Sequence, residues 1–235
     1  MHIAEGFLSP AQCAIWYAAS APFVIHGAKA VIAESRKSPE NKLLLAAAGA
    51  FTFVLSAIKL PSVTGSSSHP TGTGLGAVLF KPPIMAFLGT IVLIFQALLL
   101  AHGGITTLGA NVFSMAIAGP WAGYGIYLLA KKAKLPWYVG IFGAMFFADL
   151  VTYCVTSLQL AIAYPDAGSG FTGSLAKFLG IFAVTQIPLA VMEGLLGILV
   201  FRFLSKVALP ELQRLGVAGF GTRSASYQRE EAVHV

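Results

Sequence analysis

The first two residues of the sequence, Met1 and His2, bring together three nitrogen atoms that can bind a single metal ion. A bulky side chain at position 2 generally prevents removal of the initiator methionine, so we expect the α-amine of Met1 to be free. This amine, the His2 amide nitrogen and His2 Nδ1 can close two fused chelate rings and leave one position in their plane open. Such planar nitrogen sets favour Ni(II), Cu(II) or low-spin Co(II) over Zn(II) and Mg(II). Because a histidine at position 2 is usually unrelated to metal binding, a second feature must support the chelate.

The segment from residue 61 to residue 80 supplies this second feature, since it is rich in Gly, Ser and Thr and contains His69. Long ordered loops usually carry function, and at membrane depth irregular backbone is tolerated only where it is buried in protein or lines a cavity. The segment lacks the Lys of a phosphate-binding loop and does not match the dinucleotide-binding fingerprint. We predict that His69 fills the open position of the chelate.

The composition indicates what kind of protein positions these ligands. Of the 235 residues, 57% are hydrophobic and 10% are charged, with a mean hydropathy of +0.79. Soluble domains carry about 25% charged residues. The sequence therefore predicts an all-α polytopic membrane protein, because a transmembrane β-barrel would show alternating segments of about ten residues. The net charge of +6 is interpreted as membrane topology and not as nucleic-acid binding.

Two further features have plain interpretations. Cys13 and Cys154 lie far apart in apolar stretches, so we interpret them as small packed residues. The first eleven residues contain no Lys or Arg and carry Glu5, so we expect no cleavable signal peptide.

Apolar runs separated by basic turns predict about seven transmembrane helices, with the N-terminus outside and the C-terminus in the cytoplasm. The clear runs cover residues 11–33, 43–60, 82–101, 136–163 and 174–205. Arg36, Lys37 and Lys42 mark an inner turn by the positive-inside rule, and so do Lys131 and Lys132.

The run from Ile105 to Lys132 poses a counting problem. As one helix it would be about 42 Å long, against about 30 Å of hydrocarbon. The His69 loop is predicted outside, and Lys131 and Lys132 are predicted inside, so an odd number of membrane crossings must separate them. Residues 82–101 supply one of these crossings. We therefore expect the run to cross twice, breaking near Gly119 and Pro120, or to form a re-entrant hairpin.

Several long motifs resemble the CbiM/NikM family, the substrate-binding S components of energy-coupling-factor (ECF) transporters for cobalt and nickel. The motifs are MHIAEGFLSP, VLSAIKLPSVTGSSSHPTGTGLG, LIFQALLLAHGGITTLGANVFSMAIAGP, VTSLQLAIAYPD and KFLGIFAVTQIPLAVMEGLL. The similarity runs from Met1 to about Phe203 and also implies seven segments. It implies that the metal is held by Met1, His2 and His69, the residues that the chelate argument selects.

The resemblance further implies a single transmembrane substrate-binding domain over residues 1–208. In this domain the N-terminal segment 1–10 folds into the bundle and chelates the metal, and residues 61–80 form the metal-site loop. Co(II), or alternatively Ni(II), is the implied transported substrate, with no organic cofactor. The implied partners are a CbiQ-like transmembrane coupling (T) subunit, CbiO-like ATPase subunits, a small CbiN-like membrane subunit and the lipid bilayer.

Other polar residues are candidates for supporting roles. Ser68, His102 and Asn111 could orient the ligands, although His102 could equally cap helix carbonyl groups. Gln96 and Asn111 need partners at membrane depth, and Asp149 is expected to be hydrogen-bonded within the bundle. His26 is interpreted as a packed histidine. Residues 209–235 are expected to form a poorly ordered cytoplasmic tail without chemistry.

Three classes of function compete. A metal-uptake component is supported by the ligand set and the motifs. An intramembrane zinc protease would need H-E-x-x-H, which is absent from the sequence. A channel or structural subunit predicts no tight metal binding. Within the first class, the planar nitrogen set favours nickel, whereas the motifs look more like the cobalt branch linked to cobalamin synthesis. We therefore predict cobalt, with ATP hydrolysis left to partner subunits because the chain has no nucleotide motif.

Overall fold

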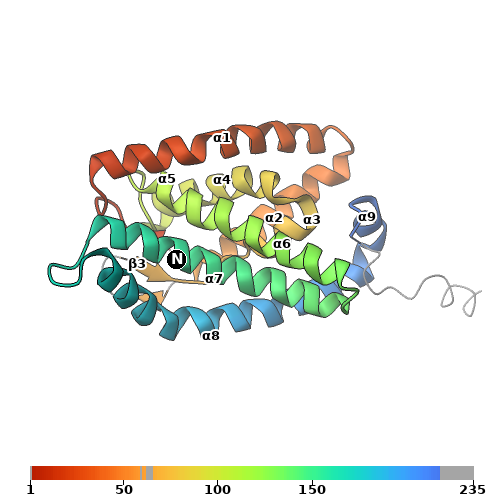
Figure 1. Ribbon diagram of the computed structural model, residues 1–235. Helices are drawn as coiled ribbons and strands as arrows, with labels where there is room; N and C mark the ends of the chain where they lie inside the picture. Colours follow the sequence, from red (N-terminus) through yellow and green to blue (C-terminus); the bar gives the residue numbers. More distant parts are fainter. Residues whose placement is uncertain (1, 59, 62–65, 218–235) are drawn as a thin grey trace, which may run out of the picture.

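The structure is a computed structural model that describes residues 2–58, 60–61 and 66–217. Met1, residues 62–65 of the predicted metal-site loop and residues 218–235 of the predicted tail lie outside the described residues. Long helices run side by side through the molecule (Figure 1), which confirms the predicted all-α membrane class. Within the described residues, five helical runs are long and apolar enough to cross a membrane: Pro10–Ser35, Pro82–Leu100, Leu108–Lys132, Trp137–Ala163 and Gly170–Val207.

The helices follow the predicted apolar runs closely. They are α1 Pro10–Ser35, α2 Pro39–Ala57, α3 Thr73–Phe80, α4 Pro82–Leu100, α5 Leu108–Asn111, the π-helical η1 Val112–Ala118, α6 Gly119–Lys132, α7 Trp137–Ala163, α8 Gly170–Val207 and α9 Leu209–Arg214. The five clear runs agree with α1, α2, α4, α7 and α8 within four residues at each end.

Local sequence explains where the first two helices begin. The Ser9 hydroxyl accepts a hydrogen bond from Gln12 N at 3.4 Å, and Pro10 occupies the first helical position. The same pattern recurs where Ser38 precedes Pro39 at the start of α2. A serine cap satisfies a free N–H group of the first turn, and a proline there has no N–H to leave unpaired.

The run from Leu108 to Lys132 crosses the bundle once, so the predicted double crossing or re-entrant hairpin is wrong. The elements α5, η1 and α6 follow one another without a loop and continue along the bundle in Figure 1. Gly119 and Pro120 do not break this run. Pro120 lies in the first turn of α6, directly after the wider π-helical turns of η1, where a missing N–H group is tolerated.

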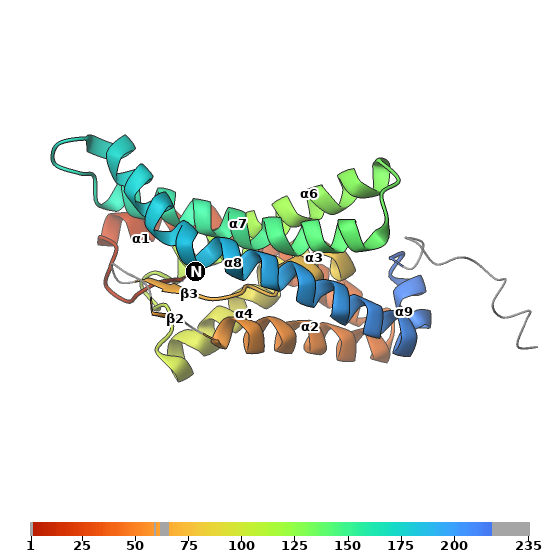
Figure 2. The same ribbon diagram turned by 90° about the horizontal axis from the view of Figure 1, so that it is seen from below.

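The pass that the sequence analysis assigned to this run is made by residues 66–80. Three short strands, β1 His2–Ile3, β2 Leu60–Pro61 and β3 Ser66–Ser68, lie toward one end of the bundle, here called the strand end. From β3 the chain enters α3, which lies farther along the bundle than β3 in Figure 2 and packs against α4, α6 and α7. All residues of α3 except Leu79 are buried. Because α3 has only 8 residues and follows a Gly-, Ser- and Thr-rich loop, hydropathy did not reveal it.

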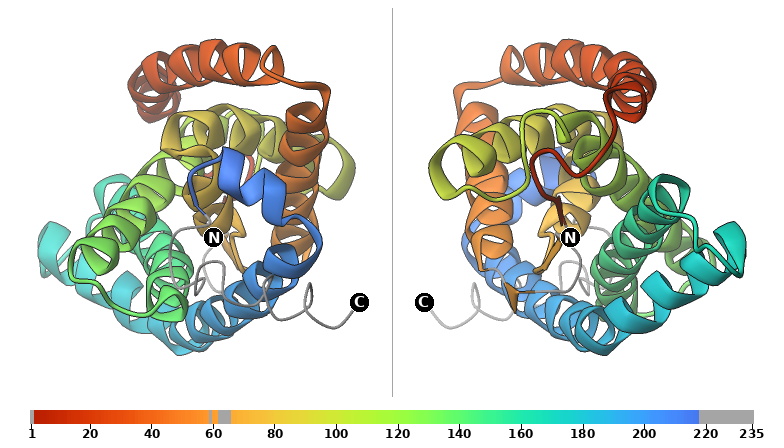
Figure 3. Two further views of the ribbon diagram at one scale, coloured as in Figure 1. Left: turned by 90° about the vertical axis from the view of Figure 1, so that its right-hand side faces the viewer. Right: turned by 90° about the vertical axis from the view of Figure 1, so that its left-hand side faces the viewer.

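The first segment of the chain turns into the middle of the helices instead of remaining outside them. Figure 3 shows helices arranged around the strands, with α1 lying outside this ring. Ile3 and Leu8 are buried in a core cluster with Phe182 of α8 and Leu160 of α7. The predicted insertion of the N-terminal segment into the bundle therefore has an apolar cause, since these side chains leave water on insertion.

Three smaller predictions need correction. The expected tail does not begin at residue 209, because α9 is helical and its Leu212 is buried in a core cluster with Phe201. Cys154, expected to be packed, is exposed on α7. His26, also expected to be packed, is exposed on α1. In an apolar helix that faces lipid, hydropathy does not separate inward from outward positions.

Candidate metal centre

A small antiparallel sheet places the start of the chain beside the His69 loop. The strand order is β1–β3–β2, and β1 pairs with β3 in the register His2 opposite Ser67 and Ile3 opposite Ser66. His69 follows directly after β3. His2 and His69, which are 67 positions apart in the sequence, are thereby brought into contact.

Three buried imidazole rings form the centre of the site. His2, His69 and His102 each offer a ring nitrogen within 4.8 Å of the others. The ring centroids are 4.3 Å apart for His2 and His69, 4.3 Å for His2 and His102, and 4.8 Å for His69 and His102. All three side chains are at most 2% exposed. His102 therefore lies as close to the centre as the two histidines that the sequence proposed as ligands.

The facing atoms are those that the chelate requires. His2 Nδ1 contacts His69 Nε2 directly. On the far side of the second ring, His69 Nδ1 lies 2.8 Å from the carbonyl oxygen of Pro70. A carbonyl oxygen can only accept, so His69 Nδ1 carries the ring proton and Nε2 presents its lone pair toward His2.

Burial keeps these imidazoles neutral. Loss of water around the ring lowers the pKa of His2 well below its usual value, and the neighbouring His69 and His102 lower it further. Burial likewise lowers the pKa of His69 well below its usual value. Since a transition metal binds the neutral imidazole, both side chains are in the metal-binding protonation state at neutral pH.

The backbone next to His2 is held by the loop that precedes α5 and by α5 itself. Asn111 Oδ1 accepts a hydrogen bond from Ile3 N, and the Thr107 hydroxyl donates to Ile3 O at 2.8 Å. Gly103 has a φ of +81°, and a Cβ there would lie 3.0 Å from His2 Cδ2. A glycine is therefore required at position 103 both for the backbone conformation and for the close approach of the ring.

The backbone beyond His69 is held by a buried carboxylate from α8. Glu193 accepts hydrogen bonds from Thr71 N at 2.5 Å, Thr71 Oγ1 at 2.9 Å and Gly72 N at 2.9 Å. The side chain is 1% exposed. A buried carboxyl group of this kind is tolerated because its oxygens are hydrogen-bonded, and the contact ties the His69 loop to α8.

Further hydrogen bonds tie the N-terminal segment and α1 to neighbouring loops at the strand end. Glu5 accepts from the Thr106 hydroxyl and from Thr106 N, and Tyr17 OH donates to Ile105 O at 2.5 Å. In the α7–α8 turn, Tyr164 OH donates to Phe7 O.

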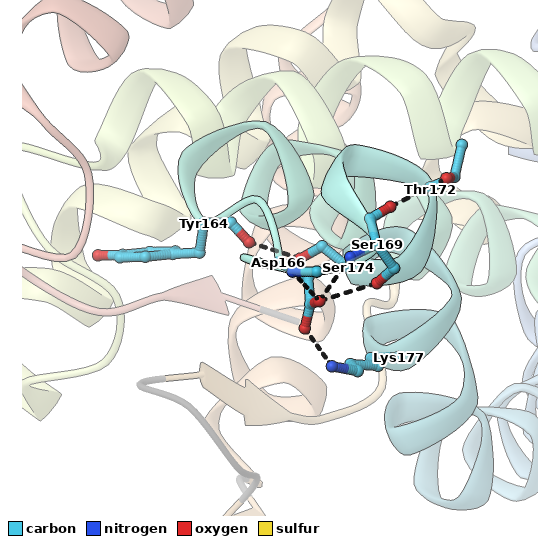
Figure 4. A network of polar contacts seen from close by, with 7 residues as sticks. Tyr164, Asp166, Ser169, Thr172, Ser174 and Lys177 are labelled. Carbon is cyan, nitrogen blue, oxygen red and sulfur yellow. Dashed lines mark hydrogen bonds and ion pairs between the residues drawn. The ribbon is translucent and has the colours of Figure 1, made fainter.

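The same α7–α8 turn is ordered by its own polar network, which Figure 4 shows. Asp166 accepts from Ser169 N at 2.9 Å and pairs with Lys177 of α8. The Ser174 hydroxyl donates to Tyr164 O at 2.5 Å. The turn that holds Tyr164 against the N-terminal segment is thus anchored to α8.

The other predicted residues have mixed outcomes. Asn111 lies beside the site, but the Ser68 hydroxyl contacts Thr185 Oγ1 at 2.8 Å and none of the rings. Ser67, one position earlier and on the opposite face of the strand, contacts His102 Nε2 at 2.6 Å. Asp149 is hydrogen-bonded by Gln186 at 3.0 Å within the bundle, as predicted. Met1, the third predicted ligand, lies outside the described residues.

The sequence analysis did not recognise the role of Glu193. The available signal was an acidic residue deep inside an apolar run, which in a membrane helix indicates a function or a dedicated partner.

These features define a multi-pass membrane protein with a buried, nitrogen-rich cluster suited to a transition metal ion. The chain is similar to a family described as "Cobalt uptake substrate-specific transmembrane region", whose profile matches residues 2–211. It is 69% identical over 235 residues to the cobalt transport protein CbiM of Propionibacterium freudenreichii subsp. shermanii, covering 100% of both chains. It is 68% identical to the CbiM of Streptomyces coelicolor over 217 residues, covering 92% of this chain and 94% of the relative.

Solved structures agree with this similarity. A crystal structure of a transition metal transporter matches with a TM-score of 0.72 and 31% identity, covering 88% of this chain and 93% of that one. A truncated transition metal transporter matches with a TM-score of 0.70 and 30% identity, covering 88% and 99%. The chain belongs to the CbiM family. It is a component of a transition metal transporter of the inner membrane and not an enzyme.

Proposed function

We propose that this chain is the substrate-specificity (S) component of an ECF-type transporter that binds Co(II) from outside the cell and carries it inward in support of cobalamin synthesis. The observation that carries the proposal is the pair of facing atoms His2 Nδ1 and His69 Nε2, buried together with His102. The names and folds of the relatives support cobalt as the substrate.

The proposed ligands are the Met1 amine, His2 and His69, with Asn111 and Thr107 fixing the backbone beside them. His102 either supplies a further nitrogen or orients the cluster through Ser67. A neutral set of nitrogen ligands suits late first-row metals. The closed strand end explains how such a site could retain its ion, because water is kept from the ligands.

The proposal assigns energy coupling to partners. The chain contains no nucleotide-binding motif, so ATP hydrolysis belongs to CbiO-like subunits, with a CbiQ-like coupling subunit and a small CbiN-like subunit beside this chain in the bilayer. We also place the strand end outside and α9 in the cytoplasm, because α6, whose last turn carries Lys131 and Lys132, ends on the opposite side of the bundle from the strands.

Ni(II) uptake is the second candidate, favoured by the planar nitrogen set that Met1 and His2 can form. A competition titration of the purified chain with Co(II), Ni(II), Cu(II) and Zn(II) tests both candidates. We expect one ion per chain and loss of binding in His69→Ala. The exposed histidine variant His26→Ala is the matched control and should bind normally. A chain that binds none of the four ions tightly would instead support a channel or structural subunit.

A further inference from the structure

A cavity with basic side chains lies at the end of the bundle opposite the strands. It has a volume of about 370 Å³ and is here called the basic cavity. Its walls come from the second half of α1 and the turn after it, from the junction between α3 and α4, and from α9. The charged residues of its lining are Glu34, Lys37, Lys81 and Arg214. Because Figure 1 shows α9 and the strands at opposite ends, this cavity is separate from the histidine cluster.

The lining of the basic cavity has an excess of positive charge. Its one carboxylate, Glu34, already pairs with Lys37 at 2.6 Å. Arg214 has acidic partners on α2 and α9, 3.6 and 3.1 Å away, and neither of them lines the cavity. Within the part of the chain that the structure describes, Lys81 has no acidic partner at salt-bridge distance. The cavity therefore suits an anion that contacts Lys81 and Arg214.

The backbone of Lys81 adopts a conformation that normally requires glycine. Its φ is +71° and its ψ is +153°, a region that other residues almost never occupy. Pro82 and Pro83 follow at the first positions of α4, and no side chain caps this helix. The N–H groups of its first turn, beginning with Ile84 in the cavity wall, have no partner within the helix. A lysine at a position suited to glycine, beside the positive end of a helix, indicates that its ammonium group is used.

A second cavity, of about 210 Å³ and here called the apolar cavity, adjoins the basic one. The two share the lining residues Leu79, Phe80 and Leu215. The apolar cavity lies between α2 and α8, next to α9, and Glu211 is the only charged residue among the described residues that line it. Phe203 of α8 also lines it and is 61% exposed, so the cavity reaches the side of the bundle that faces lipid. An acyl chain can therefore enter it from the bilayer.

We propose that the two cavities together bind one anionic phospholipid of the inner leaflet, with its phosphate at Lys81 and Arg214 and an acyl chain between α2 and α8. Basic pockets between transmembrane helices on the cytoplasmic side bind anionic lipid headgroups, and the proposed topology places this end there. A soluble phosphate would use the basic cavity alone and would leave the adjoining apolar cavity empty. A lipid fills both and holds α9 against the end of the bundle.

The test is a lipid titration of the full chain with its native N-terminus, in detergent, followed by native mass spectrometry. The two lipids are dioleoylphosphatidylglycerol, which is anionic, and dioleoylphosphatidylcholine, which has the same acyl chains and no net charge. Lys81→Gly removes the ammonium group and suits the local backbone, so this variant should fold. Lys134→Gly is the matched control, because Lys134 is also exposed, also has a positive φ (+54°), follows α6 at the same end and lines neither cavity.

We expect wild type to bind one phosphatidylglycerol more tightly than phosphatidylcholine. Lys81→Gly should bind phosphatidylglycerol at least about fivefold more weakly, the effect of one lysine near an anionic headgroup. Lys134→Gly should bind it as wild type does. Equal binding of the two lipids by wild type, or equal binding of phosphatidylglycerol by the two variants, would overturn the proposal.

Two further measurements separate the lipid from other anions and partners. Ala47→Trp fills the apolar cavity from an exposed position on α2 without changing the charge, and it should also weaken phosphatidylglycerol binding. If Ala47→Trp has no effect, or if inorganic phosphate displaces the lipid, the site takes soluble phosphate and the lipid is excluded. If Lys81→Gly loses association with the coupling and ATPase subunits while lipid binding is unchanged, the basic cavity is a protein contact instead. Lys81→Gly should bind Co(II) normally, so failure of the lipid site leaves the proposed function untouched.

Discussion

Asn111 holds both backbone groups of Ile3 with a single side chain. Its Oδ1 accepts from Ile3 N at 2.7 Å, and its Nδ2 donates to Ile3 O at 3.0 Å. This pairing occupies the side of β1 that faces α5, while β3 lies on the other side. The strand is therefore fixed between a side chain and a neighbouring strand, and the ring of His2 has little freedom to move.

This relationship predicts the effect of changing Asn111. Asn111→Leu removes both hydrogen bonds and leaves the buried Ile3 N unpaired, at a cost of about 1–3 kcal/mol, while Ile3 O keeps its bond from the Thr107 hydroxyl. We expect metal affinity to fall about 10- to 100-fold, as for other residues that orient metal ligands. Asn111→Asp keeps the acceptor and should lose less. Isothermal titration with Co(II) measures both variants. Equal, wild-type affinities would mean that Ile3 needs no anchor.

The Glu193 contact predicts a combined loss of stability and affinity. In Glu193→Gln an NH₂ group replaces one carboxyl oxygen, although the backbone N–H groups of Thr71 and Gly72, which can only donate, bond to the two oxygens of Glu193. At least one of these buried N–H groups then loses its acceptor, which costs about 1–3 kcal/mol, so we expect a destabilisation of that order. Metal affinity should fall with it, because Thr71 lies two residues from His69. Thermal unfolding in detergent and a cobalt titration measure the two effects.

A matched acidic control is available on α9. Glu211 pairs with Arg214 at a half-exposed surface, so Glu211→Gln should change stability by less than about 1 kcal/mol. A Glu193→Gln variant that resembles Glu211→Gln in both measurements would show that the loop is positioned without the carboxylate.

Some of this site could be predicted from the sequence, and some could not. His2 and His69 could be identified as candidate ligands from the sequence because each has a distinctive position. His2 is the second residue of the sequence, and His69 lies in a polar loop of an apolar protein. Gly103 acts through its close approach to the His2 ring, and this approach depends on which segments become neighbours in the fold. The same limit explains the error over residues 105–132, where the missing pass was hidden in α3, a helix too short for a hydropathy signal.

A blocked N-terminus provides a direct test of the amine. His2 is 1% exposed and Ile3 is fully buried, so residues added before Met1 would have to enter a closed site. They would also convert the amine into an amide, which binds metal only after losing a proton. We expect an N-terminal tag or acetylation to abolish cobalt binding, while the same tag at the C-terminus leaves binding unchanged. Tight binding by the N-terminally tagged chain would remove Met1 from the ligand set.

The pH dependence of binding separates the amine and amide from the imidazoles. Burial lowers the pKa of His2 and of His69 well below the usual value of about 6.5, so protons do not compete for these rings near neutral pH. In the metal-free protein the same shift means that the unfolded chain binds more protons than the folded one below about pH 6.5. Stability should therefore decrease as the pH falls through that range.

Metal binding between pH 7 and pH 9 should instead follow the Met1 amine, whose usual pKa is about 7.7–8.0, and the His2 amide, which must lose its proton to become a ligand. Affinity should keep rising with pH above 7, with more than one proton released per metal ion near pH 7. A site made of buried imidazoles alone would show a flat affinity over the same range, because its ligands are already neutral. The measurement is a cobalt titration from pH 6 to pH 9 in two buffers of different ionisation enthalpy, which counts the released protons. If affinity is flat above pH 7 and fewer than one proton leaves at pH 8, the three histidines bind the metal without the chelate at the start of the chain.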